Sequence, residues 1–143
     1  HFEGFAGVKA VYEELLYCKS RHWDSITPTK SFLGQYGEDF HKYVNVKKSE
    51  RGITTRALWE SVKVNKPRST YAKQKRREVR QLPSNMEGKF LSKIIIADNK
   101  VALVMSASDP GAILITSQEL HSAFMALFET LWSVSKPVAV DRV

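Results

Sequence analysis

The sequence has little of what secreted, membrane-spanning or metal-binding proteins need. Its 143 residues contain one cysteine, Cys18, which cannot form a disulfide within the chain, and this fits a reducing cytoplasm. The four histidines are scattered with no ligand pair at a useful spacing, so we expect no metal site, and no motif indicates a cofactor. No apolar run is long enough to cross a bilayer and no basic-then-apolar leader is present, so we expect neither membrane association nor secretion.

Length and composition predict one domain. With 43% hydrophobic and 26% charged residues, the chain can build one core but is too short for two comfortable ones. We expect a single domain over residues 1–136, followed by a short tail over residues 137–143. The chain begins without methionine, so we expect it to be a fragment of a longer protein.

The net charge of +7 is concentrated in one segment. Residues 61–80 hold eight basic residues against one acidic residue, while the rest of the chain holds 14 of each sign. Such concentration suggests an anionic partner, whereas the plainer interpretation is a solvated helix. The candidate anion or nucleic-acid patch consists of Lys73, Lys75, Arg76, Arg77 and Arg80.

Hydrophobic periodicity predicts helices and strands in alternation. We expect helices over residues 2–18, 31–48, about 69–77 and from the Thr116-x-x-Glu119 capping box to Pro137. We expect strands over residues 23–27, 53–59, 79–82 and 112–116, with a hairpin over residues 90–106. This order predicts an α/β fold in which a mixed sheet is covered by helices on both faces.

The hairpin over residues 90–106 organises the chain. Two β-branched runs flank the turn pair Asp98-Asn99, which is typical of a hairpin buried on both faces. The same stretch reads Leu91-x-Lys93-x-x-x-x-Asp98. This spacing is similar to the phospholipase-D signature, His-x-Lys-x4-Asp, with Leu91 in place of the histidine.

Nearly the whole chain resembles the C-terminal domain of TrmB-family transcriptional regulators. Five segments carry the resemblance in the same order, namely 7–16 (GVKAVYEELL), 51–58 (RGITTRAL), 77–83 (REVRQLP), 98–102 (DNKVA) and 124–132 (FMALFETLW). The resemblance implies a phospholipase-D-like half-fold that dimerises and senses a small molecule, a sugar or a phosphorylated metabolite. It also implies a winged helix-turn-helix that binds DNA, and nothing in this chain resembles one.

We expect the chain not to be an enzyme. Phospholipase-D enzymes use the signature histidine as the nucleophile, and the alkyl side chain of Leu91 cannot attack phosphorus. Lys93 precedes an apolar run, where an ammonium group is costly unless it reaches solvent or an anion. We therefore expect Lys93 to lie in a sensing pocket rather than in an active site.

The other candidate ligand-binding residues are Thr27, Trp59, Ser106 and Asp98. Thr27, Trp59 and Ser106 are placed near strand ends, where ligands collect in open α/β sheets. Trp59 suits stacking on a planar face, but a core tryptophan is at least as consistent with the pattern. For Asp98 a simple turn role is the stronger interpretation.

Two functional hypotheses follow from these features. The first is a cytoplasmic, non-catalytic sensing and dimerisation domain, which would dimerise through apolar surface at Phe5, Phe128 and Trp132. The alternative is a nucleic-acid-binding module that uses the basic segment, although only Tyr71 supplies an aromatic side chain there.

Overall fold

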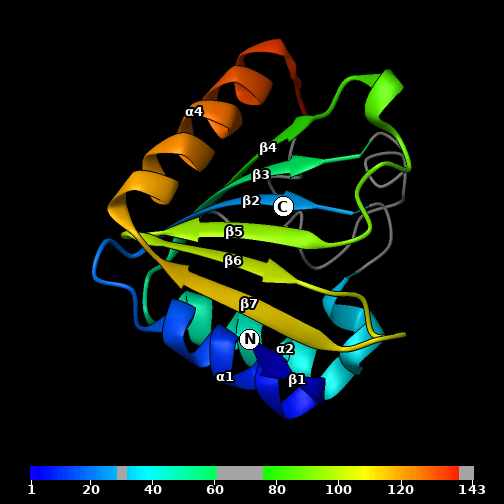
Figure 1. Cartoon of the computed structure of the whole chain (residues 1–143). Helices are drawn as coiled ribbons and strands as arrows, with labels where there is room; N and C mark the ends of the chain where they lie inside the picture. The colour runs from blue at the N-terminus through cyan, green and yellow to red at the C-terminus, as the bar shows by residue number, and fades with distance from the viewer. Residues whose placement is uncertain (29–31, 61–75, 139–143) are drawn as a thin grey trace.

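The computed structural model describes residues 1–28, 32–60 and 76–138. These residues form an eight-stranded mixed sheet in the order β1-β7-β6-β5-β2-β3-β4-β8 (Figure 1). The strands are β1 (Phe2–Glu3), β2 (His22–Thr27), β3 (Thr54–Trp59), β4 (Arg77–Gln81), β5 (Lys93–Ala97), β6 (Lys100–Val104), β7 (Gly111–Thr116) and β8 (Lys136–Pro137). Strands β2, β3 and β4 are parallel, and β5 joins the antiparallel strands β6 and β7 to the free side of β2.

Helices cover both faces of the sheet, as the sequence predicts. Helices α1 (Gly4–Leu16) and α2 (Glu38–Glu50) pack on one face, and α4 (Gln118–Val134) packs on the other (Figure 1). The neighbours Ile95 and Ile96 on β5 point to opposite faces, because Ile95 joins the cluster under α1 while Ile96 joins the cluster under α4. Both positions are buried, which explains the continuous apolar run in this strand.

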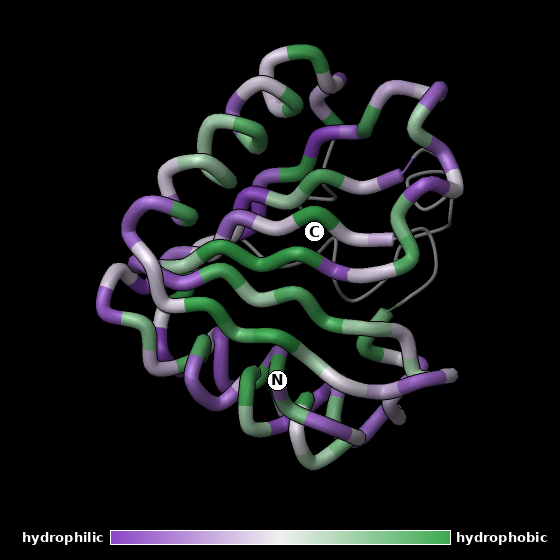
Figure 2. The backbone as a smooth tube through the Cα atoms, viewed as in Figure 1, coloured by the Kyte–Doolittle hydropathy of each residue, from purple (hydrophilic) through white to green (hydrophobic). Residues whose placement is uncertain are grey.

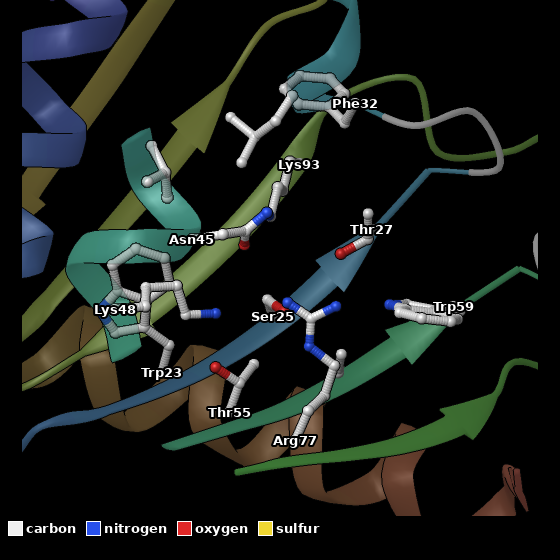
Figure 3. A pocket seen from close by; sticks show the side chains of 13 residues that line it. Trp23, Ser25, Thr27, Phe32, Asn45, Lys48, Thr55, Trp59, Arg77 and Lys93 are labelled. Carbon is white, nitrogen blue, oxygen red and sulfur yellow. The ribbon is translucent and has the colours of Figure 1, made fainter. Parts of the chain in front are cut away.

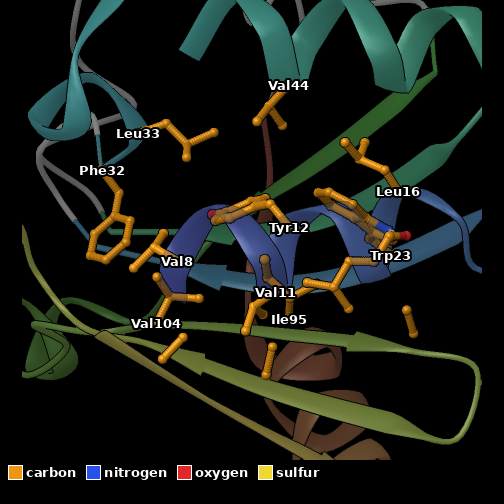
Figure 4. Close-up of a cluster of buried hydrophobic side chains, with 14 of the residues drawn as sticks. Val8, Val11, Tyr12, Leu16, Trp23, Phe32, Leu33, Val44, Ile95 and Val104 are labelled. Atoms are coloured by element: carbon orange, nitrogen blue, oxygen red, sulfur yellow. Dashed lines mark hydrogen bonds between the residues drawn. The ribbon is translucent and has the colours of Figure 1, made fainter. Parts of the chain in front are cut away.

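The larger core lies between the sheet and the two helices α1 and α2. Figure 4 shows Val8, Val11 and Tyr12 of α1 packed between Trp23 on β2 and Val104 on β6. The indole Nε1 of Trp23 donates a hydrogen bond to the carbonyl oxygen of Leu15 over 2.9 Å. Figure 2 shows the matching hydrophobic colour along strands β5, β6 and β7. These contacts fix α1 against β2 and therefore fix the position of the strand ends.

The predicted helix over residues 31–48 is wrong in extent. Residues 29–31 lie outside the described residues, Leu33–Tyr36 form the short 3-10 helix η1, and α2 begins only at Glu38. Gly37 separates the two pieces with φ of 107°, a conformation that residues with a Cβ atom rarely adopt. The aromatic stripe is nevertheless buried, with Phe40 and Val44 facing the core.

Other boundaries also differ from the predictions. Helix α1 begins at Gly4 because Phe2–Glu3 form strand β1 beside β7. Helix α4 is capped by Ser117, whose side chain accepts a hydrogen bond from the Leu120 amide, so the predicted capping box at Thr116 is wrong by one residue. The predicted tail begins with strand β8, which pairs with β4.

The predicted basic helix over about residues 69–77 falls mostly on residues 61–75, which lie outside the described residues. Its last residue, Arg77, belongs to β4 instead, so the short strand predicted over residues 79–82 begins two residues earlier. Arg77 pairs with Thr55 on β3. The pairing extends the parallel part of the sheet and carries the Arg77 side chain onto the face covered by α2.

The hairpin prediction is confirmed. Strands β5 and β6 pair antiparallel, and Asp98 supplies the positive φ of 52° that its tight turn requires. The two carboxylate oxygens of Asp98 accept hydrogen bonds from the backbone amides of Lys19 and Ser20 at 2.8 and 2.9 Å. Asp98 therefore ties the hairpin turn to the loop between α1 and β2.

Candidate functional site

A small pocket lies between α2 and the face of strands β2, β3, β4 and β5. Trp23, Ser25 and Thr27 of β2 line it, because alternate residues of a strand share a face. The remaining lining residues are Thr55, Ala57 and Trp59 of β3, Arg77 of β4, Lys93 of β5, Val44, Asn45 and Lys48 of α2, and Phe32 and Leu33 beside η1. The space in the pocket measures about 30 Å³, enough for about two water-sized groups.

Three cationic side chains from three different elements converge on this pocket. Figure 3 shows the Lys48 ammonium and the Arg77 guanidinium pointing into the same space above Ser25 and Thr55, with Lys93 at the opposite side. No aspartate or glutamate lines the pocket in the described part of the chain. The local field is therefore strongly positive, and an anion entering the pocket would meet no repelling carboxylate.

Burial of these cations is reflected in their pKa values. Burial lowers the pKa of Lys48 well below its usual value of 10.5, and the nearby charges of Arg77 and Lys93 lower it further. Burial also lowers the pKa of Arg77 to about 10. The Lys48 ammonium lies 4.8 Å from the centroid of the Trp23 ring, and this cation–π contact offsets only part of the desolvation cost.

Hydroxyl groups complete the polar lining. Ser25, Thr27 and Thr55 are all at most 5% exposed, an unusual concentration of buried hydroxyls on two adjacent strands. Thr55 Oγ1 is buried and has no hydrogen-bond partner among the described residues. A buried hydroxyl in that state can donate to an acceptor brought by a ligand.

The structure brings together three of the five predicted ligand-binding residues. Thr27, Trp59 and Lys93 line the pocket. Ser106 does not line it, and its hydroxyl lies 2.8 Å from that of Ser108 in the turn before β7. Asp98 lies at the other end of β5 from Lys93, where it holds the turn.

The described members of the basic patch contact the protein itself. Arg76 donates from Nη1 to the Gly52 carbonyl oxygen over 3.0 Å, and Arg80 donates from Nη1 to the Trp132 carbonyl oxygen over 2.8 Å. Arg77 lines the pocket. Lys73 and Lys75 lie outside the described residues. The three described members therefore do not form one surface patch, and whether the segment binds nucleic acid stays a prediction.

Sequence reasoning missed Lys48, although the sequence contains a signal for it. Phe40, Val44 and Lys48 are four residues apart, so Lys48 continues the buried stripe of α2 by one more turn. Arg77 was predicted as part of the basic patch but not as a pocket residue. Its place in the pocket depends on strand β4. The basic residues around it led instead to the prediction of a surface helix ending at Arg77.

The opposite face of the same strands carries a paired charge cluster. Asp24 accepts from Arg56 Nε and lies within hydrogen-bonding distance of His22 Nε2, both at 2.8 Å, and Arg56 Nη1 lies 2.8 Å from Glu129 of α4. Burial raises the pKa of Asp24, but the hydrogen bonds from His22 and Arg56 outweigh it, so the net shift is downward. Every charge in this cluster has a partner of opposite sign.

A second, larger hollow lies outside the predicted site. It measures about 730 Å³ and runs between α1 and the η1–α2 segment, with aromatic side chains such as Phe5 and Tyr43 and acidic side chains such as Glu13 and Glu38 along its walls. Tyr43 donates a hydrogen bond to Glu13 across it. None of the residues predicted to bind a ligand lines this hollow.

Two further features bear on the class of protein. No helix in residues 1–28, 32–60 and 76–138 is both long and apolar enough to cross a membrane. The same residues contain no group of three or more histidine, cysteine or acidic side chains arranged to hold a metal ion.

Comparison with known proteins identifies the fold. No protein-family model matches the sequence, and no curated protein matches it either. Among solved structures, the chain is similar to TrmBL2, an archaeal chromatin protein with a novel mode of DNA binding, at a TM-score of 0.64 and 16% identity over 92% of this chain. The chain spans half the length of that protein.

Two phospholipase-D-like structures match over nearly their whole length. Nuc from Salmonella typhimurium, a phospholipase D family member, has a TM-score of 0.65 and 12% identity, covering 99% of this chain and 96% of its own. NucT from Helicobacter pylori has a TM-score of 0.67 and 13% identity, covering 92% and 91%. The chain therefore has the phospholipase-D-like fold that the sequence resemblance implied, and a TrmB-type protein shares that fold.

Proposed function

We propose that this chain is a non-catalytic effector-sensing and dimerisation domain of a TrmB-like transcriptional regulator, working in the cytoplasm. The observation that carries the proposal is a cationic, hydroxyl-lined pocket without a nucleophile where the enzyme signature would require one. Leu91, at the position of the signature histidine, is 75% exposed and does not line the pocket. Lys93, at the position of the signature lysine, does line it.

Loss of the nucleophile with retention of the pocket supports sensing rather than turnover. A covalent phospho-enzyme needs an attacking side chain beside the bound phosphate, and the pocket offers hydroxyls, an amide and cations in the described residues. Within residues 1–28, 32–60 and 76–138, none of these hydroxyls is hydrogen-bonded to a histidine or carboxylate that would remove its proton. The same groups are well suited to bind an effector without altering it.

Helix α4 supports the dimerisation part of the proposal. Phe128 and Trp132, predicted to form a dimer surface, are buried in the core under α4, so that part of the prediction is wrong. The exposed apolar residues of this helix are Leu120, Leu127 and Val134, at 41%, 61% and 61% exposure. They are seven residues apart and share one stripe, which suits pairing with a second helix of the same kind.

The dimerisation step is tested by light scattering coupled to size-exclusion chromatography at tens of micromolar. We expect the unmodified chain to elute as a dimer and Leu127→Glu to elute as a monomer. The control is Val46→Glu on α2, which adds the same charge at a 43% exposed position away from α4 and should leave the dimer intact. Elution of the unmodified chain as a monomer would contradict the dimerisation part of the proposal.

The absence of catalysis is tested with a generic phosphodiester substrate. We expect no turnover by the unmodified chain. Turnover that disappears in Lys93→Ala would show that the pocket is an active site and would overturn the non-catalytic assignment.

DNA binding, in this proposal, belongs to a winged helix-turn-helix elsewhere in the regulator. A salt-dependent shift of DNA by this chain alone, lost on Arg76→Gln, would favour the basic-segment alternative instead.

A further inference from the structure

We infer that the pocket binds a compact dianionic group of the phosphate or sulfate type, with Lys48 and Arg77 as its principal cationic contacts beside Lys93. This inference rests on the proposed sensing function and deepens it by naming the class of ligand. It adds two residues to the site that the signature Leu91-x-Lys93 does not contain, one from helix α2 and one from strand β4.

The first argument is the position of Lys48. Its side chain is 5% exposed, and among the described residues it makes no hydrogen bond or ion pair with an acidic group. A buried ammonium without a counter-charge is costly, so proteins rarely retain one without a functional reason. The aromatic ring of Trp23 orients the ammonium but does not neutralise it.

The second argument is convergence. Arg77, with a pKa lowered to about 10, remains charged at neutral pH and points into the same space as Lys48 (Figure 3). Lys93 adds a third cation from β5. Three cations on three elements suit a ligand that carries two negative charges on several oxygens, because each cation can contact a different oxygen. A neutral sugar gains nothing from such a field.

The third argument is size and hydrogen bonding. A cavity of about 30 Å³ holds a compact tetrahedral group but not a sugar ring. Thr55 Oγ1, buried without a hydrogen-bond partner among the described residues, can donate to a ligand oxygen, and Ser25 stands beside it on β2. Every polar group of the floor can act as a donor, and an anion offers only acceptors. The rest of a larger ligand would extend past Trp59 and Thr27 at the strand ends.

Binding of a dianion should raise the pKa of Lys48. Arg77 on β4 and Lys93 on β5 face Lys48, Trp23 on β2 packs against it, and Asn45 neighbours it on α2. Burial and the two neighbouring cations lower the pKa of Lys48 in the free protein, and a bound dianion would raise it. The site should therefore take up protons as it fills at any pH where the free amine is partly deprotonated.

Isothermal titration calorimetry with sodium sulfate and inorganic phosphate, at constant ionic strength set with sodium chloride, tests the inference. We expect saturable binding of both dianions and at least a tenfold loss of affinity in Lys48→Met. The control is Lys47→Met, which removes the neighbouring, exposed lysine of the same helix and should keep the affinity within twofold. Glucose at the same concentrations should give no signal.

Sulfate keeps two charges throughout the neutral range, so proton uptake on its binding comes from the protein. Repeating the titration in buffers of different ionisation enthalpy should reveal uptake by the unmodified chain and none by Lys48→Met. Thr55→Val, which preserves shape, serves as a second variant should Lys48→Met fail to fold, and we expect a threefold to tenfold loss.

Three results would overturn the inference. They are no sulfate or phosphate binding at tens of millimolar, equal affinity in the unmodified chain and both variants, or binding of glucose in place of the dianions. None of these results touches the tests of the proposed function, which read dimerisation and phosphodiester turnover. The two can therefore fail separately.

Discussion

Strands β2 and β3 carry charged groups on both of their faces, and the two faces handle charge in opposite ways. On the face under α4, the Arg56 guanidinium lies between Asp24 and Glu129, each 2.8 Å away. On the face under α2, Lys48 and Arg77 meet with no carboxylate in the described lining. The first arrangement pairs charges of opposite sign, whereas the described lining of the second brings cations together without a carboxylate.

The difference separates a structural charge cluster from a candidate binding site. Paired charges raise the pKa of Arg56 against the effect of burial, because Asp24 and Glu129 both favour its charged form. Burial, and then the charges of Arg77 and Lys93, lower the pKa of Lys48, so the charged form of Lys48 costs free energy in the folded protein. Changes on the face under α4 should destabilise the fold, and replacing Lys48 on the face under α2 should stabilise it and weaken the proposed binding.

The largest effect is expected from Asp24→Asn, which breaks the paired face. It leaves Arg56 and His22 without their buried carboxylate, and we expect a loss of about 3 kcal/mol in the free energy of unfolding, the lower end for a broken buried pair because Arg56 keeps some solvent and Glu129. Urea denaturation at pH 7 measures it. A loss below about 1 kcal/mol would mean that the pairing contributes little to the stability of the fold.

The same carboxylate affects how the free energy of unfolding depends on pH in acidic solution. Because the folded pKa of Asp24 lies below its unfolded value of 3.8, its contribution is present above pH 3.8 and is lost as pH falls through the folded pKa. Urea midpoints measured below pH 5 should therefore fall less steeply in Asp24→Asn than in the unmodified chain. Parallel curves for the two proteins would contradict the shift.

Lys48→Met should act in the opposite direction because it removes a buried ammonium group. We expect a gain of roughly 1–4 kcal/mol, the range seen when buried ion pairs are replaced by apolar side chains. The folded pKa of Lys48 lies below its unfolded value of 10.5, so the gain is full below the folded pKa and disappears as pH approaches 10.5. Urea denaturation across pH 6–10 measures both the gain in stability and its dependence on pH. A destabilised variant would show that Lys48 has a structural role in the folded protein.

A smaller loss is expected from Glu129→Gln, which sharpens the comparison within the paired face. The Glu129 side chain is 55% exposed, so solvent screens its ion pair with Arg56. We expect a change of at most about 1 kcal/mol in the free energy of unfolding. The ratio of this change to that of Asp24→Asn shows how strongly burial amplifies one pair over the other.

Thr55→Val should have the smallest effect on stability. Its Oγ1 makes no hydrogen bond in the described part of the chain, so replacing the hydroxyl with a methyl group of similar shape should be nearly neutral, within about 0.5 kcal/mol. Thermal denaturation of the free protein suffices. A loss of 2 kcal/mol or more would show that the hydroxyl already has a structural partner.

Much of the fold was readable from local patterns. The β-branched runs around Asp98-Asn99 predicted the hairpin, and the continuous apolar face of the last helix predicted α4, because both depend on neighbours close in sequence. The helix predicted over residues 31–48 runs through Gly37 because helical spacing continues on both sides of it, and its φ of 107° is not encoded in that spacing. The two-residue strands β1 and β8 carry too short a pattern to predict.

Only part of the candidate site could be predicted from the sequence, for a related reason. Thr27, Trp59 and Lys93 mark strand ends and a signature, which are sequence features. Lys48 and Arg77 come from a helix and a strand that must first be placed against β3, and charged residues ordinarily indicate a solvated surface. The register Thr55–Arg77 and the stripe Phe40–Val44–Lys48 turn them inward, and both depend on tertiary packing.

Asp98 has a consequence for how signatures of this kind are recognised. Its carboxylate fastens the hairpin turn to the amides of Lys19 and Ser20, at the far end of β5 from Lys93. A sequence-motif search that scored Lys93 and Asp98 together would treat them as two parts of the same active site. In this structure Lys93 lines the pocket, whereas Asp98 stabilises the hairpin turn. Closure of the turn is enough to explain the aspartate, so its presence is not evidence of catalysis.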